Sequence, residues 1–256
     1  MSSELIDTTA ALQDFLSALP ACDGSRPDLY IDLEGNDLCR QGTLSLLNVF
    51  VESRKSVHLI DVTELKDKAF STAAPDGRTL KSLLESDHVI KVFFDIRNDS
   101  DALFSHYGVA VCNIQDVQLM ELASRSFSKR CVNGLAKCIE NDASLGYSEK
   151  QRWRAVKERG QRICRSGPHG YAIFDRRPLS DDLKEYCAQD VVILSSLRDT
   201  YRAKLCNAWW RKIEAETVAR IELSHGPSYN GKGRHSKSKI RPRMLLDLAV
   251  SPQYID

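Results

Sequence analysis

The hexapeptide Leu29-Tyr30-Ile31-Asp32-Leu33-Glu34 decides the fold of this chain. Its apolar residues predict a largely buried β-strand. Because strand side chains alternate between faces, Asp32 and Glu34 project from one side of it, roughly 6.5–7 Å apart along the strand. Paired carboxylates on a buried strand need a cation to offset repulsion and desolvation, so the pattern favours a metal site; an exposed edge strand is the alternative interpretation.

Apolar runs further along the chain extend this strand into a sheet. Residues 43–51 and 56–62 follow with short polar breaks, which favours three antiparallel strands. Strand and helix then alternate, which favours parallel pairing: helix 79–86, strand 89–94, helix 100–107 ended by Gly108, and strand 111–117, before a mostly helical stretch over 118–165. The expected fold class is α/β, with a mixed five-stranded sheet flanked by helices.

With 256 residues, 42% of them hydrophobic, the chain can bury one full-sized core. We expect an N-terminal helix and loop over residues 1–27, with the helix at 4–19, and a main domain over 28–224. Residues 225–256 begin with HGPSYNGKGRHSKSKIRPRM, a stretch rich in Gly, Ser, Lys and Arg without periodicity. This composition predicts a basic, flexible tail.

Cysteine and histidine spacing excludes two classes of small, cross-linked protein. Eight cysteines contain no C-x-x-C pair and six histidines no H-x-x-x-H pair, so neither a disulfide framework nor a zinc site is indicated. No secretory signal pattern and no run of 18 apolar residues is present. We expect a cytoplasmic or nuclear protein without a membrane partner.

Charge is unevenly distributed along the chain although the net charge is only +1. Residues 1–124 carry 10 Lys and Arg against 20 Asp and Glu, whereas residues 125–177 carry 13 against 5. Acidic residues that gather where cations bind, with basic segments elsewhere, are typical of proteins that handle phosphates. Solvated surface faces give similar counts, so charge alone leaves nucleic acid as one of two interpretations.

Three further residues are candidates for the same site as Asp32 and Glu34. Tyr186 and Asp190 lie four residues apart on a helix that starts at Ser180, so they share one face. Asp99 follows an apolar strand at the first turn of the next helix, at a sheet crevice where functional groups are common. A half-buried tyrosine beside a surface aspartate, and a helix-capping aspartate, are the structural alternatives.

The ordered motifs resemble the ribonuclease D-like branch of the DEDD, or DnaQ-like, exonuclease superfamily, which has a ribonuclease H-like fold. YIDLEG is similar to the first motif, KVFFDIRNDSDALFSHYGV to the second and RRPLSDDLKEYCAQDV to the third, over roughly residues 28–205. Tyr186, four residues before Asp190, matches the tyrosine (DEDDy) type, whereas the histidine type would need His at Glu185. Among members of this branch, the sequence most resembles Egalitarian-type and fungal proteins.

This resemblance implies a metal-dependent 3′→5′ exonuclease that releases nucleoside monophosphates from a single-stranded RNA or DNA 3′ end, with RNA favoured. It implies two divalent cations, Mg²⁺ or Mn²⁺, which neutralise charge on the reacting phosphate. Asp32 would bridge both ions, Glu34 and Asp190 would hold the ion near the attacking water, Asp99 would hold the other, and Tyr186 would orient the water. The alternative is a weakly active or inactive nucleic-acid-binding adaptor with the same fold.

Basic residues before the third motif are candidates for binding the nucleic-acid backbone. Arg152, Arg154, Lys157 and Arg162 form a dense basic stretch around Trp153, suited to phosphates and to base stacking. A solvated helix face is the alternative. Arg176 and Arg177 directly precede Pro178 and Leu179 of the third motif, which adds them to the candidates.

Overall fold

The computed structural model describes the chain except residues 1–2, 21–25, 27, 167–168 and 233–256. Its strands are β1 Ser3–Ile6, β2 Leu29–Glu34, β3 Leu46–Val51, β4 Ser56–Asp61, β5 Lys91–Phe93 and β6 Ile114–Asp116. Its helices are α1 Thr9–Ala18, α2 Val62–Leu65, α3 Lys68–Ser71, α4 Leu80–Glu85, α5 Arg97–Tyr107, α6 Val117–Ser124, α7 Leu135–Asp142, α8 Tyr147–Ser166, α9 Asp181–Arg202 and α10 Asn207–His225, with short 3-10 turns η1 Glu52–Arg54 and η2 Gly170–Asp175.

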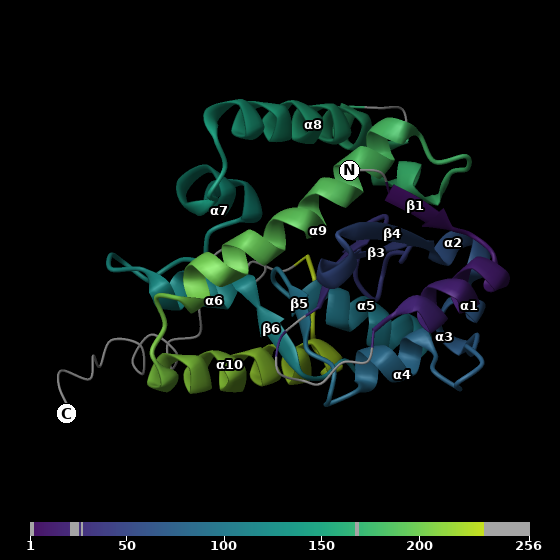
Figure 1. The fold of residues 1–256 in the computed structure, drawn as a ribbon, viewed down its shortest axis with the longest axis horizontal. Coiled ribbons are helices and arrows are strands. Elements are labelled where there is room, and N and C mark those ends of the chain that lie inside the picture. The colour runs from purple at the N-terminus through teal and green to yellow at the C-terminus, as the bar shows by residue number, and fades with distance from the viewer. Residues whose placement is uncertain (1–2, 21–25, 27, 167–168, 233–256) are drawn as a thin grey trace.

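The strands form one mixed sheet in the order β1-β4-β3-β2-β5-β6, with helices packed on it (Figure 1). Strands β2, β3 and β4 are antiparallel neighbours, as their short polar breaks predicted. Strand β5 pairs with β2 and β6 with β5 in parallel, which the alternation of strand and helix predicted. The predicted α/β fold class is therefore confirmed, with β2 inside the sheet between β3 and β5.

The sheet has six strands in this structure, whereas five were expected. Strand β1 pairs in parallel with β4 and takes up the first residues of the helix expected over 4–19, and α1 begins only at Thr9. Thr8 caps that helix by accepting a hydrogen bond from the backbone N–H of Ala11. A four-residue apolar–polar pattern fits either a strand or a helix turn, and the deciding partner, β4, lies some fifty residues away in the sequence.

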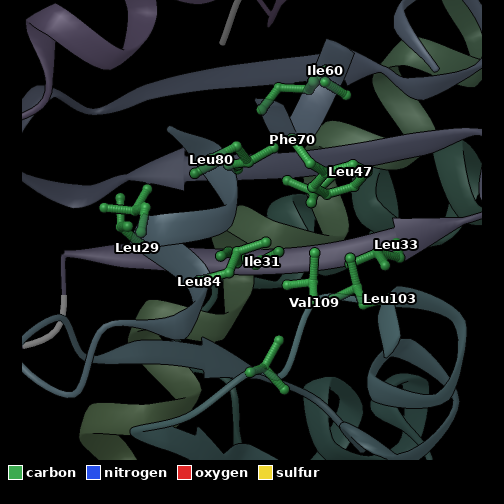
Figure 2. Close-up of a cluster of buried hydrophobic side chains, with 14 of the residues drawn as sticks. Leu29, Ile31, Leu33, Leu47, Ile60, Phe70, Leu80, Leu84, Leu103 and Val109 are labelled. Carbon is green, nitrogen blue, oxygen red and sulfur yellow. The ribbon is translucent and has the colours of Figure 1, made fainter. Parts of the chain in front are cut away.

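The two faces of β2 contribute to separate cores. Leu29, Ile31 and Leu33 point into the core that contains side chains of α3, α4 and α5 (Figure 2). Tyr30 points the opposite way, into a core formed largely with α6 and α9. Because alternate residues share a face, Asp32 and Glu34 lie on the α9 side, as the sequence pattern predicted.

Helix α10 packs against α5, α6 and β6, and the chain then returns over the main domain. Tyr229, with 4% of its surface exposed, and Gly231 are buried, so these two residues attach the segment to the domain although they fall in the predicted tail. The remainder of that tail, and most of the predicted loop over 20–27, lie outside the described residues. The division at residues 27/28 and 224/225 stays a prediction.

Candidate active site

Strand β2 places two carboxylates at the C-terminal end of a central strand. In its pairing with β3, Asp32 lies opposite Asn48 and Glu34 opposite Leu46. The alternate positions of β2 are fully packed, which holds the strand in one register. The two acids are therefore fixed by the core on the other face of the sheet.

Helix α9 brings a third carboxylate to the same place. Ser180 caps the helix by accepting a hydrogen bond from the N–H of Leu183, and Asp181 and Asp182 occupy the positive end of the helix dipole. One turn apart on the helix face, Tyr186 and Asp190 are both buried against the sheet. Carboxylate oxygens of Asp32, Glu34 and Asp190, hereafter the carboxylate cluster, all lie within 4.8 Å of one another.

Asp99 sits beside this cluster rather than within it. It lies in the first turn of α5 and is 7% exposed, and burial followed by the charge of Asp32 raises its pKa well above the ordinary range. Its sequence neighbours have other partners, since Asp95 is ion-paired with Arg97 and Asp101 with Arg40. Of the three aspartates in this segment, Asp99 is therefore the one that lacks an arginine partner and interacts with the charge of the cluster.

The cluster carries more negative charge than its surroundings neutralise. Burial, followed by the charge of Asp190, raises the pKa of Asp32 to about 7. Burial, followed by the charge of Asp32, raises the pKa of Glu34 well above its ordinary value. Burial also raises the pKa of Asp190, although Lys157 opposes that shift. Of the three acids, Asp190 is buried and Asp32 and Glu34 are half-buried. Carboxylates this close together do not all ionise without a cation, so protonation or cation binding must relieve the repulsion.

Lys157 provides one positive charge at this point. Its Nζ forms an ion pair with Asp190 and donates a hydrogen bond to the Tyr186 hydroxyl over 3.2 Å. Burial alone would lower the pKa of Lys157, but the charge of Asp190 and its hydrogen bond raise it overall, so the side chain is charged. Its expected contact was the nucleic-acid backbone, a prediction that stays untested; the contact observed is with the carboxylate cluster.

Tyr186 is held between helices α8 and α9. A methyl group added to Gly160 of α8 would lie 2.1 Å from the Tyr186 ring, so only glycine permits this approach. The ring is 8% exposed, and burial followed by the charge of Glu34 raises its pKa strongly. The hydroxyl therefore stays protonated and can act as a hydrogen-bonding group beside the carboxylates.

The other predicted nucleic-acid-binding residues lie at separate places. Arg152 and Arg162 are exposed on α8, while Arg154 forms an ion pair with Glu140. Arg176 contacts His169, whereas Arg177 forms an ion pair with the buried Asp61 and donates to the carbonyl of Phe174 over 2.8 Å. That geometry favours a structural role for Arg177. The remaining assignments stay predictions.

The donor set of the cluster fits a hard divalent cation. All the available ligand atoms are carboxylate oxygens, which Mg²⁺ and Mn²⁺ prefer. Among the described residues, buried Asp190 Oδ1 has no hydrogen-bond partner, and neither has the amide of Asn48, directly across from Asp32. Buried polar groups without partners require an explanation, and a cation with its water would satisfy both. Sequence reasoning missed Asn48, whose only signal is its polarity within the apolar run LLNVFV.

A pocket of about 450 Å³ opens next to Glu34. Its wall includes the β2–β3 loop at Asp37, the first turn of α5 at Asn98, and Tyr171 of η2. A volume of this size is within the range of small-ligand sites. Gly231 and Lys232, from the segment expected to be a flexible tail, complete the lining.

Comparisons with known proteins agree with this geometry. Human piRNA biogenesis protein EXD1 is 28% identical over 173 residues, which cover 66% of this chain and 31% of that protein, so the chain spans about a third of this relative's length. The crystal structure of Trypanosoma brucei RNase D in complex with RNA U12 superposes with a TM-score of 0.73 at 21% identity, covering 96% of this chain and 78% of that one. Brucella melitensis NrnC with bound Mg²⁺ gives a TM-score of 0.59 at 19% identity, covering 91% and 100%.

At these identities the two structures establish the ribonuclease H-like fold and nothing finer. No helix in the described part of the chain is long and apolar enough to cross a membrane. The model of the 3′-5′ exonuclease domain family matches residues 3–205, well over half of the chain. With the carboxylates and the tyrosine at the matching motifs, this chain belongs to the 3′-5′ exonuclease family, in its ribonuclease D-like, DEDDy branch.

Proposed function

We propose that this protein is a metal-dependent 3′→5′ exonuclease that hydrolyses single-stranded nucleic acid, RNA in preference to DNA, to nucleoside monophosphates. The observation that carries the proposal is the carboxylate cluster, three acids from two distant segments within 4.8 Å of one another beside a buried tyrosine. A family member without activity would have little reason to keep such a destabilising arrangement.

In this proposal the acids of the site bind two divalent cations. Asp32, Glu34 and Asp190 would hold one cation, and Asp99, with Asp32, would hold a second. When bound, Mg²⁺ or Mn²⁺ would neutralise the charge of the phosphate and lower the pKa of a water molecule. The hydroxyl of Tyr186, kept protonated by burial, orients the attacking water rather than removing its proton.

Two observations support RNA as the substrate class. The ribonuclease D used for comparison was crystallised with RNA, and the curated relative is named for piRNA biogenesis. The exposed arginines of α8, the helix that also carries Lys157, suit the phosphate backbone of either nucleic acid. The expected cytoplasmic or nuclear location stays a prediction.

The test is hydrolysis of 5′-labelled single-stranded RNA and DNA with Mg²⁺, with Mn²⁺ and with a chelator. We expect stepwise shortening from the 3′ end, faster on RNA and abolished by the chelator. Asp32→Asn, purified in parallel, controls for contaminating nuclease. Shortening at the same rate in the variant, or none in the wild type, overturns the proposal.

The Lys157 contact favours a second candidate, a nucleic-acid-binding adaptor. An ion pair from Lys157 to Asp190 neutralises one cluster member without metal, which would stabilise an inactive site. The same experiment separates the two functions, because an adaptor binds labelled RNA but leaves it uncut at saturating Mn²⁺.

A further inference from the structure

The segment after α10 lies at the candidate active site although its sequence is typical of a detached tail. Gly231 and Lys232 line the pocket beside Glu34, together with residues of β2, α5 and η2 that lie at least sixty positions away in sequence. Neither the carboxylate cluster nor the motifs of the family involve this segment. Its contacts therefore require a separate explanation.

Asn98 anchors the segment at two points. The Tyr229 hydroxyl donates a hydrogen bond to Asn98 Oδ1 over 2.6 Å, and Asn98 Nδ2 donates to the Gly231 carbonyl over 3.4 Å. The Arg40 guanidinium lies 5.8 Å from the centre of the Tyr229 ring, which is almost fully buried. Because Asn98 directly precedes Asp99, the segment is tied to the turn that carries a proposed metal ligand.

Gly231 shows how closely the segment approaches this turn. A Cβ at residue 231 would lie 2.8 Å from Cys39 Cβ and 2.9 Å from Asn98 Oδ1, below any normal contact distance. A side chain here would force the backbone outward. Glycine therefore allows the segment to close one side of the pocket.

Lys232 then reaches across to the β2–β3 loop. Its Nζ lies 2.6 Å from Asp37 Oδ2, and both side chains are 57% exposed. An exposed ion pair of this kind contributes little to stability and exchanges partners readily. A cation at the rim of a pocket beside a phosphodiesterase site can instead bind a phosphate.

We propose that residues Tyr229–Lys232 form the outer wall of the pocket that receives the 3′-terminal nucleotide, and that Lys232 leaves Asp37 to bind the phosphate backbone of that substrate. This inference rests on the proposed function and adds a substrate-binding element to it. Tyr229 and Gly231 set the position of the wall, and Lys232 supplies its charge. Asp37 holds the lysine when no substrate is bound.

Three variants of the full chain test the wall. Lys232→Ala removes the cation, so KM for single-stranded RNA should rise about 3- to 10-fold with kcat nearly unchanged, and the dependence of binding on salt should weaken by about one phosphate contact. Gly231→Ala displaces the wall and should also raise KM. Asp37→Asn removes the competing partner, so it should lower KM or leave it unchanged while Lys232→Ala raises it.

Lys55→Ala is the matched control, because Lys55 is also an exposed lysine in an ion pair, with the half-buried Glu52, at the far end of β3 and β4. Thermal unfolding of each variant separates loss of the wall from loss of the fold. If the enzyme is active and KM of Lys232→Ala and of Gly231→Ala equals that of Lys55→Ala, the proposed wall is refuted. The proposed exonuclease function is not affected by that outcome. A wild type that hydrolyses no RNA or DNA refutes both proposals together.

Discussion

Two groups of acids with little solvent exposure differ in how their charge is balanced. Four acids, the paired acids, are at most 2% exposed and each has its own arginine: Asp61 with Arg177, Asp101 with Arg40, Asp116 with Arg220, and Glu121 with Arg125. The carboxylate cluster has three acids, and in the described part of the chain only Lys157 forms an ion pair with it.

The difference separates structural acids from functional ones. Asp61 and Glu121 each receive two guanidinium nitrogens, whereas Asp101 and Asp116 each receive one guanidinium nitrogen together with backbone N–H donors. Each paired acid is therefore satisfied in both charge and hydrogen bonding. The cluster has a surplus of negative charge and raised pKa values, which a folded chain retains only with a cation or with protons. The negative charge of the paired acids is balanced and that of the carboxylate cluster is not, which indicates a metal site at the cluster.

The largest expected effect is on hydrolysis when the cluster loses its central acid. Asp32→Asn should lower kcat/KM on single-stranded RNA by about 10³-fold or more, since several kcal/mol of charge stabilisation depend on the cations. RNA binding, measured by fluorescence anisotropy, should persist. The control is Asp181→Asn, a fully exposed acid on α9, which should keep full activity. An equal loss of kcat/KM in Asp32→Asn and Asp181→Asn would contradict the assignment of the cluster as the functional group of acids.

Breaking one of the paired acids should instead damage the fold. Arg220 donates to Asp116 Oδ2 over 2.7 Å and to Gln118 Oε1 over 3.1 Å. Arg220→Met leaves Asp116 buried without its cation and should lower the free energy of unfolding by about 3–5 kcal/mol in urea titrations. Arg211→Met, on the exposed side of the same helix, should cost far less. A stable Arg220→Met protein would mean that Asp116 does not need its arginine.

Tyr186 is an uncharged group linked to the carboxylate cluster through Lys157, which contacts both the Tyr186 hydroxyl and Asp190. Tyr186→Phe should lower kcat roughly 10²-fold, the lower end of the range for one positioned hydrogen-bonding group, with Mn²⁺ affinity nearly unchanged. Single-turnover kinetics at saturating Mn²⁺ provide the measurement. Full activity would reduce the tyrosine to a packing role against Gly160 and Phe174.

Local pattern in the sequence was enough for the parts of this architecture that depend on neighbouring residues. The alternation in β2 correctly predicted the face that carries Asp32 and Glu34, and Gly108 correctly predicted the end of α5. The grouping of Asp32, Glu34 and Asp190 was also predicted, but through motif resemblance rather than from spacing alone. The roles assigned to these residues stay predictions.

Features that depend on distant partners were not predicted. Strand β1 needs the edge of β4, and Lys157 meets Asp190 only because α8 folds back along α9. The buried part of the C-terminal segment was missed because its composition resembles disorder; Tyr229, the one aromatic residue in 225–244, was the available signal. Burial of this ring depends on Arg40 and Asn98, which no local pattern connects to it.

A smaller effect is expected on the pH dependence of stability, which should reveal the raised pKa of Asp32 in the carboxylate cluster. A carboxyl whose pKa is raised on folding contributes stability that is full below its unfolded value and is lost as pH rises through the folded value. For Asp32 that window runs from 3.8 to about 7. The stability of metal-free Asp32→Asn relative to wild type should therefore increase between about pH 4 and pH 7, measured by urea unfolding with chelator. A difference that stays constant with pH would show that Asp32 is not strained by its neighbours.

Binding of Mn²⁺ to the metal-free protein, followed by titration calorimetry, tests the central claim that the surplus charge of the carboxylate cluster forms a metal site. The wild type should bind Mn²⁺, Asp190→Asn should weaken that binding on the order of 100-fold, and Asp181→Asn should leave it unchanged. Wild-type protein that binds no Mn²⁺, or Asp190→Asn that binds it as tightly as the wild type, would contradict the account.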